Sequence, residues 1–252
     1  MRVSYRPSFW IVSLVCVLGI PTGLWAGPQE ESLETARLLA TLLDSGRVTI
    51  AKHQDLINAP TGSGTRFTAS LFRTDTIKEF QGRTGVNLAD LEQASVPPMA
   101  KPLLTQLLQT SVRTVESFEP VLNLPAMKYK GLIPATFGTE TASRFQALTQ
   151  IYLKQTAPNG LVRNQKNKPD AYESAALTKL AADPIAPSDR QGFGEIVEDG
   201  QAARLIMPLY YAKACLMCHG EPKGERDISG FPREGAKEGD LGGAISVKIP
   251  LK

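Results

Sequence analysis

Apolar side chains recur at steps of three or four positions through residues 30–58, which predicts one buried face of a long α-helix. The pair Ser45-Gly46 predicts a bend within this helix, because glycine and serine are weak points in a helical backbone. The sequence Asn58-Ala59-Pro60 predicts its end. The positions that form the buried face are Leu39, Leu43, Gly46, Ile50, His53 and Ile57.

Two further helices are expected before residue 125. Thr68 is placed to cap a helix over about residues 68–82. Residues 84–102 are polar and contain three prolines, so we interpret them as a connection. The helical pattern returns in residues 103–123 and predicts a helix that ends before Pro125.

These segments contain an internal similarity. A shift of 65 positions aligns residues 42–88 with residues 107–153 without a gap. We therefore predict a duplicated helix–loop–helix unit, the alternative being a coincidence between two amphipathic helical pairs. Identical residues in the two copies are Leu42 and Leu107, Leu43 and Leu108, Asn58 and Asn123, Pro60 and Pro125, and Phe80 and Phe145.

The pattern changes in the second half of the chain. Pro169-Asp170 predicts the start of another helix, and Asp199-Gly200 between two β-prone runs predicts a hairpin. The predicted strands are residues 152–156, 193–198, 202–211 and 243–249. The fold class is therefore α+β, with a helical N-terminal part and an antiparallel sheet, the hairpin and last strand sharing that sheet over about residues 190–252.

The first 26 residues have the features of a secretory signal peptide. Arg2 and Arg6 form a basic start, residues 8–20 are apolar, and a small-residue cleavage point follows Ala26. We expect residues 27–252 to form one exported, periplasmic domain, with an uncleaved N-terminal anchor as the alternative. No second apolar segment is long enough to span a bilayer, so no stable membrane insertion is expected after cleavage.

The charge and the number of cysteines argue against two features, nucleic-acid binding and a disulfide framework. Removal of residues 1–26 leaves 226 of 252 residues and lowers the formal charge from +3 to +1. No long basic run is present, so nucleic-acid binding is not expected. Cys16 leaves with the signal peptide, and only Cys215 and Cys218 remain, so a disulfide framework is excluded.

Those two cysteines form a C-x-x-C-H motif with His219, the attachment signature of one c-type haem. Cysteines three positions apart on a helical turn present both sulfurs on one face, where each can form a thioether to a porphyrin vinyl group. The adjacent histidine then reaches the iron as the proximal ligand. Alternatives are a thioredoxin-type redox pair, which needs a βαβ context, a zinc site, which needs four ligands, and a simple disulfide, which leaves His219 unexplained.

The second axial ligand is less determined. His53 is the other histidine of the chain and lies on the predicted buried helical face, whereas its partner in the second copy is Phe118. A buried imidazole needs a polar partner, and haem iron is one such partner, so His53 is a candidate distal ligand. Met127 and Met207 are rival thioether ligands, and an open sixth position is a further alternative.

Several stretches of the second half resemble a family of single-haem c-type cytochrome domains with a PAS-like fold, long catalogued as a domain of unknown function. They are residues 130–138, 163–173 and 204–208, the haem motif with Gly220, and residues 239–247. Members of the family occur as exported stand-alone proteins and as sensor domains of membrane histidine kinases. In one form of the family a cysteine of the helical region is the second axial ligand, and this chain has no cysteine there.

The resemblance implies an antiparallel sheet with the haem between sheet and helices, and a role in redox or ligand sensing or in electron transfer. Such a role requires a redox or signalling protein as partner. A small peroxidase-like haem enzyme is the alternative, and it would need an open iron site and a distal base. Glu116 and Glu119 are the carboxylates considered for that base, although surface carboxylates on a helix are the commoner explanation. A purely structural haem-binding module is a third hypothesis.

Overall fold

The computed structural model describes residues 27–59, 66–124, 127–183 and 192–251. The predicted signal peptide, residues 1–26, lies outside this range. Within the described residues, no helix combines the length and the apolarity needed to cross a bilayer.

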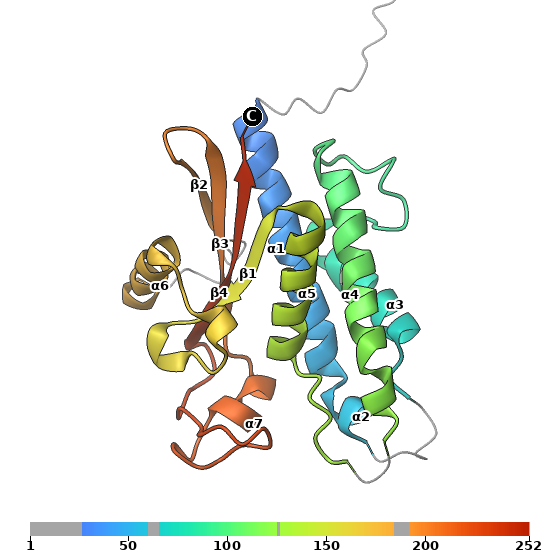
Figure 1. Cartoon of the computed structure of the whole chain (residues 1–252), viewed down its shortest axis with the longest axis vertical. Helices are drawn as coiled ribbons and strands as arrows, with labels where there is room; N and C mark the ends of the chain where they lie inside the picture. The colour runs from blue at the N-terminus through green and yellow to red at the C-terminus, as the bar shows by residue number, and fades with distance from the viewer. Residues whose placement is uncertain (1–26, 60–65, 125–126, 184–191, 252) are drawn as a thin grey trace, which may run out of the picture.

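Four long helices form the N-terminal part: α1 (Pro28–Lys52), α3 (Ala69–Thr84), α4 (Ala100–Leu122) and α5 (Pro134–Thr149). Helix α1 packs against the other three and also against the sheet, so it lies at the centre of the molecule (Figure 1). Its leucines are therefore buried on more than one side, and each contributes roughly 1.5–3 kcal/mol of burial free energy. The fully buried leucines of α1 are Leu38, Leu39, Leu42 and Leu43.

The second half contributes a four-stranded antiparallel sheet with the order β1-β4-β3-β2. The strands are β1 (Tyr152–Thr156), β2 (Phe193–Val197), β3 (Ala202–Tyr210) and β4 (Leu241–Pro250). Strands β2 and β3 form the predicted hairpin, in which Glu198, Asp199 and Gly200 have positive φ angles. The last strand pairs with β3, so the prediction that it shares the sheet of the hairpin is confirmed.

Both faces of the sheet are covered. On β3, Leu205 and Met207 join the large core under the helices, while Ile206 between them belongs to a smaller cluster beneath α6 (Ala171–Ala182). Helix α6 therefore lies on the opposite face of the sheet from α1 (Figure 1). Its predicted start is confirmed, since Asp170 and Glu173 form a reciprocal capping box. The arrangement is of the α+β class, as expected.

Helix α1 continues through Ser45-Gly46 to Lys52 without a break, and the bend expected at this pair stays a prediction. The Ser45 hydroxyl donates to the Thr41 carbonyl at 2.8 Å and so remains within the helix. Gly46 allows the Phe137 ring to pack closely against α1, because a Cβ atom at this position would lie 2.6 Å from the buried ring. The helix ends instead at His53, and a short turn, α2 (Gln54–Asn58), follows.

The two predicted helix–loop–helix segments share their second helix to the residue. A shift of 65 positions places Ala69–Thr84 on Pro134–Thr149, and each helix ends at a left-handed residue, Gly85 or Gln150. The last threonine of each helix donates to a phenylalanine carbonyl at 2.8 Å. The first helices of the two segments differ. Helix α1 ends at Lys52, next to His53, whereas α4 continues through Phe118, the position that aligns with His53.

Substitution of Gly46 by alanine is expected to lower the free energy of unfolding by about 1–3 kcal/mol, because the new methyl group would overlap a ring that cannot move. Phe137 is fully buried and packs on Phe72 with 5.1 Å between ring centroids. Gly82→Ala in α3 is the control, since nothing lies within 4 Å of its Cβ position. That variant should gain up to about 1 kcal/mol. Urea denaturation checks both, and equal stabilisation of the two variants would contradict the steric explanation.

Candidate functional site

The C-x-x-C-H motif lies just beyond the end of β3. Residues Lys213–Cys215 form the 3-10 turn η4, which leads directly into α7 (Leu216–His219) below the sheet in Figure 1. Both thiols are half-buried, and they are not joined to each other. Gly220 after the motif allows the turn to close, because a Cβ atom there would lie 2.6 Å from the Leu216 carbonyl oxygen.

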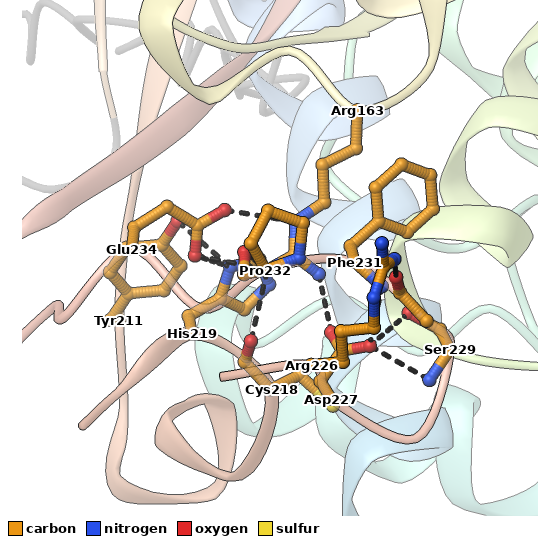
Figure 2. Close-up of polar contacts among 11 residues, drawn as sticks. Arg163, Tyr211, Cys218, His219, Arg226, Asp227, Ser229, Phe231, Pro232 and Glu234 are labelled. Carbon is orange, nitrogen blue, oxygen red and sulfur yellow. Dashed lines mark hydrogen bonds and ion pairs between the residues drawn. The ribbon is translucent and has the colours of Figure 1, made fainter. Parts of the chain in front are cut away.

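His219 is held by its Nδ1 atom. This nitrogen lies 2.9 Å from Glu234 Oε2 and 3.3 Å from the Tyr211 hydroxyl (Figure 2). The Tyr211 ring stacks on the imidazole with 4.7 Å between centroids and 27° between planes. Hydrogen bonding and stacking together fix the orientation of the imidazole.

These contacts also determine which nitrogen carries the proton. Glu234 accepts two hydrogen bonds from Arg163, at 2.8 and 3.0 Å, which favours an ionised carboxylate. An ionised carboxylate only accepts hydrogen bonds, so Nδ1 of neutral His219 must be the donor. The lone pair then resides on Nε2, the atom a metal ion would bind. Burial, followed by the Arg163 charge, lowers the pKa of His219 against the opposing effect of Glu234.

Arg163, from the connection between β1 and α6, is the centre of the surrounding network. Besides Glu234, it donates to Asp227 at 2.6 Å and to the carbonyl oxygen of Cys218 at 2.9 Å. Its guanidinium also lies over the Phe231 ring, 5.4 Å from the centroid. In Figure 2 it lies between Glu234 on one side and Asp227 on the other. One side chain therefore ties the motif to the loop that precedes β4.

Asp227 organises the middle of that loop. Its side chain is fully buried, and Oδ1 accepts hydrogen bonds from the backbone and hydroxyl of Ser229 and from the Phe231 amide. Burial would raise the pKa of Asp227, but hydrogen bonds from Ser229 and Arg163 outweigh it and lower that pKa. Asp227 thus links the backbone of its own loop to Arg163.

The helical part also reaches this site. Tyr129 lies in the connection between α4 and α5, and burial raises the pKa of its phenol, with further contributions from neighbouring Cys218 and Asp227. Hydrogen bonds join the motif to the loop before β4 and to Arg163, and Tyr129 lies within the electrostatic influence of this site.

The geometry bears on the alternative uses of the cysteines. Burial, and after it the Asp227 charge, raise the pKa of the Cys218 thiol, whereas a thioredoxin-type nucleophile requires a lowered one. In the part of the chain that the structure describes, no three histidine, cysteine or acidic residues converge as a metal cluster. Among the described residues, the two thiols and His219 are therefore not joined by a further cluster of zinc ligands.

The residues present fit haem c. Two unjoined thiols three positions apart and an imidazole with a lone pair on Nε2 are the donor set that a covalently attached haem requires. Apolar side chains are exposed at the motif and in its loop, namely Met217, Ile228 and Phe231. Such exposed groups suit contact with a large apolar ring.

His53 has a different partner from the one considered above. Its Nε2 lies 2.9 Å from Asp75 on α3, and its ring contacts Phe67 with 5.4 Å between centroids. The polar partner that a half-buried imidazole needs is therefore a carboxylate. Ligation of iron by His53 stays a prediction that gains no support from this geometry.

The other candidates considered for the iron or its surroundings are dispersed. Met207 is buried in the main core, and Met127 is exposed in the α4–α5 connection. Glu119 accepts a hydrogen bond from the Ala69 amide at the start of α3, and Glu116 is exposed on α4. Glu119 thus has a local role in the helical part.

Four residues of the site were not predicted as functional: Arg163, Tyr211, Asp227 and Glu234. Arg163 lies in a stretch that contributes to the family resemblance, which was the only sequence signal for it. Glu234 lies in a charged, glycine-rich stretch without periodicity, where nothing distinguishes it from its neighbours.

Comparisons with known proteins assign the chain to a family. A family model described as Tll0287-like matches residues 26–250. Among solved structures, the chain is similar to the cyanobacterial heme-protein Tll0287, at 20% identity over 60% of this chain and 92% of that chain, with a TM-score of 0.41. No curated protein matches this chain.

Proposed function

Because the chain belongs to the Tll0287-like family, we propose that it is a haem protein with one haem c, attached through Cys215 and Cys218 and ligated by His219. The observation that carries the proposal is the fixed imidazole: its Nδ1 donates to Glu234, so its Nε2 is free to bind iron. The family carries the name of Tll0287, whose solved structure is described as that of a cyanobacterial heme-protein. The motif supplies the two thiols that covalent attachment needs.

Each side chain has a role in this proposal. Cys215 and Cys218 anchor the porphyrin, while Tyr211 and Glu234 hold the plane of the His219 ring. Arg163 fixes the carboxylate and the backbone of the motif relative to each other. When bound, the haem iron supplies a one-electron redox couple and a position for a further axial ligand.

We infer electron transfer or redox and ligand sensing, without chemical turnover, as the biological role. A peroxidase-like enzyme would need a distal base, and the histidine other than His219 is already engaged by Asp75. Export through residues 1–26 would place the protein in the periplasm, where c-type haem is attached. A redox or signalling protein is then required to pass on the electron or the signal.

Protein exported from cells that attach c-type haem should retain the haem mass after acid–organic extraction, because thioether bonds survive that treatment. Mass spectrometry of the extracted protein measures this. The control is the same chain without residues 1–26, which should accumulate in the cytoplasm without covalent haem. Loss of the haem from the exported protein, with both thiols free, would overturn the proposal.

Optical spectra of the same preparation distinguish the two roles. A six-coordinate low-spin haem that does not react with carbon monoxide favours electron transfer. A five-coordinate haem, or one that binds the gas, favours ligand sensing.

A further inference from the structure

We propose that Glu234 is a positioning residue for the iron ligand His219, and that this carboxylate, held by Arg163, stabilises the oxidised form of the haem. The proposal rests on the proposed function and extends it, because it assigns the control of the redox equilibrium to named residues outside the motif.

The chemical basis is the nature of the partner at Nδ1. A histidine that binds a metal donates its other ring N–H to a carboxylate, a backbone carbonyl or a water molecule. Here the acceptor is a full negative charge at 2.9 Å. A charged acceptor makes the imidazole more basic at Nε2, so it donates more electron density to the iron. Ferric iron carries the larger positive charge and gains more from that donation than ferrous iron does.

The position of Glu234 is determined by more than its contact with His219. Arg163 holds both carboxylate oxygens, at 2.8 and 3.0 Å, in a bidentate pair. The same guanidinium donates to the carbonyl oxygen of Cys218, one residue before the ligand. The carboxylate and the motif are therefore attached to a common group, and Figure 2 shows this convergence.

A purely structural role for Glu234 is the competing explanation. The loop that contains it has other anchors, however. The Ala236 amide donates to the His219 carbonyl oxygen at 2.8 Å, Asp227 is bonded to Arg163, and Arg226 donates to the Gly230 carbonyl oxygen. The loop does not depend on Glu234 alone, so neutralising this side chain should change the iron ligand more than the fold.

The test is Glu234→Gln in the exported, haem-loaded protein, measured by redox titration. The amide oxygen keeps an acceptor for the Nδ1 proton, while the substitution removes the charge and the hydrogen bond from Arg163 Nε to the other oxygen. We expect the equilibrium constant for reduction to rise about tenfold, the scale on which outer partners of metal ligands act. Resonance Raman spectra of the five-coordinate ferrous form should show a lower iron–histidine stretching frequency.

Two controls remove a negative charge elsewhere. Glu225→Gln lies in the same loop, where Glu225 is exposed and 3.8 Å from Arg233, and Glu140→Gln lies on α5 in an exposed pair with Lys166. Both should leave the redox equilibrium and the iron–histidine frequency close to those of the parent. A Glu234→Gln protein that matches these two controls would overturn the proposal.

Arg163→Lys is the second variant, decisive if Glu234→Gln does not retain haem. Lysine keeps the charge but loses the planar fork that orients the carboxylate. We expect the reduction equilibrium to shift in the same direction as in Glu234→Gln, and an unchanged equilibrium would contradict the positioning role. A parent protein without covalent haem overturns the proposed function itself, whereas haem-loaded parent and variants with equal equilibria overturn only the role of Glu234.

Discussion

Replacing Cys215 and Cys218 together by serine is expected to abolish covalent haem attachment completely. A hydroxyl group does not form the thioether that links a cysteine to a porphyrin vinyl group, so no covalent bond remains. The fold should survive, because both thiols are half-buried and belong to η4 and α7, outside the two apolar clusters of the molecule. Mass spectrometry after acid–organic extraction should therefore show the protein mass without haem.

Two further variants give this experiment its controls. Cys215→Ser alone should retain the haem through the single thioether at Cys218, in reduced yield. Met217→Ala lies between the two cysteines and removes a side chain that is 53% exposed, so it should keep both thioethers. Haem mass retained by the double serine variant would show that the attachment lies elsewhere in the chain.

Glu173→Gln is expected to lower the free energy of unfolding by about 3–5 kcal/mol, the cost of breaking a buried ion pair from one side. The carboxylate is fully buried between α6 and the sheet. One oxygen accepts from the Tyr152 hydroxyl and from Arg204, and the other from Lys154 and the Asp170 amide. Glutamine would direct an NH₂ group at donors on one of these sides. It would also leave Lys154 without its carboxylate partner and Arg204 with Asp170 as its remaining one.

Urea denaturation measures the effect, and Glu140→Gln again provides the comparison. Glu140 pairs with Lys166 at 3.1 Å on the surface, and exposed pairs contribute about 0–1 kcal/mol. A loss below about 1 kcal/mol in Glu173→Gln would mean that the network under α6 does not hold that helix on the sheet. The haem spectrum should be unchanged in either variant, since the network is separate from the motif.

Elements whose signals act within a few residues were predictable from the sequence. Thr68 caps α3 through the Leu71 amide, Asp170 caps α6, and Asp199-Gly200 makes the hairpin turn. The role of Gly46 was not predictable from the sequence, because it depends on a contact with a distant residue. What determines that position is the ring of Phe137, about ninety residues further along the chain, and no local pattern reports such a contact.

The candidate site also contains residues that local sequence signals identify and residues that they do not. Cys215, Cys218 and His219 lie within five consecutive residues, so their spacing alone predicted a haem-attachment motif. The group that orients His219 is a carboxylate fifteen positions later, held by an arginine 71 positions before it. A glutamate in a charged loop has no distinguishing neighbour in the sequence, and its role becomes visible only when the fold brings it to Arg163. The partner of His53 was not predictable either. The periodicity of residues 30–58 indicated that His53 lies on a buried face, but it could not show that Asp75 of α3 lies opposite.

The central position of β4 has a consequence for the order in which the exported chain folds. Strand β4 lies between β1 and β3, and its pairing with β1 joins residues 96 positions apart, from Tyr152 to Lys248. A chain that emerges in the periplasm from its N-terminus onward can pack its helices first, whereas the complete sheet requires residues 241–250. The cysteines of the motif precede that strand, so they emerge while the sheet beside them is still incomplete. An enzyme that attaches haem would therefore meet the two thiols on an open, partly folded chain, before β4 closes the structure next to them.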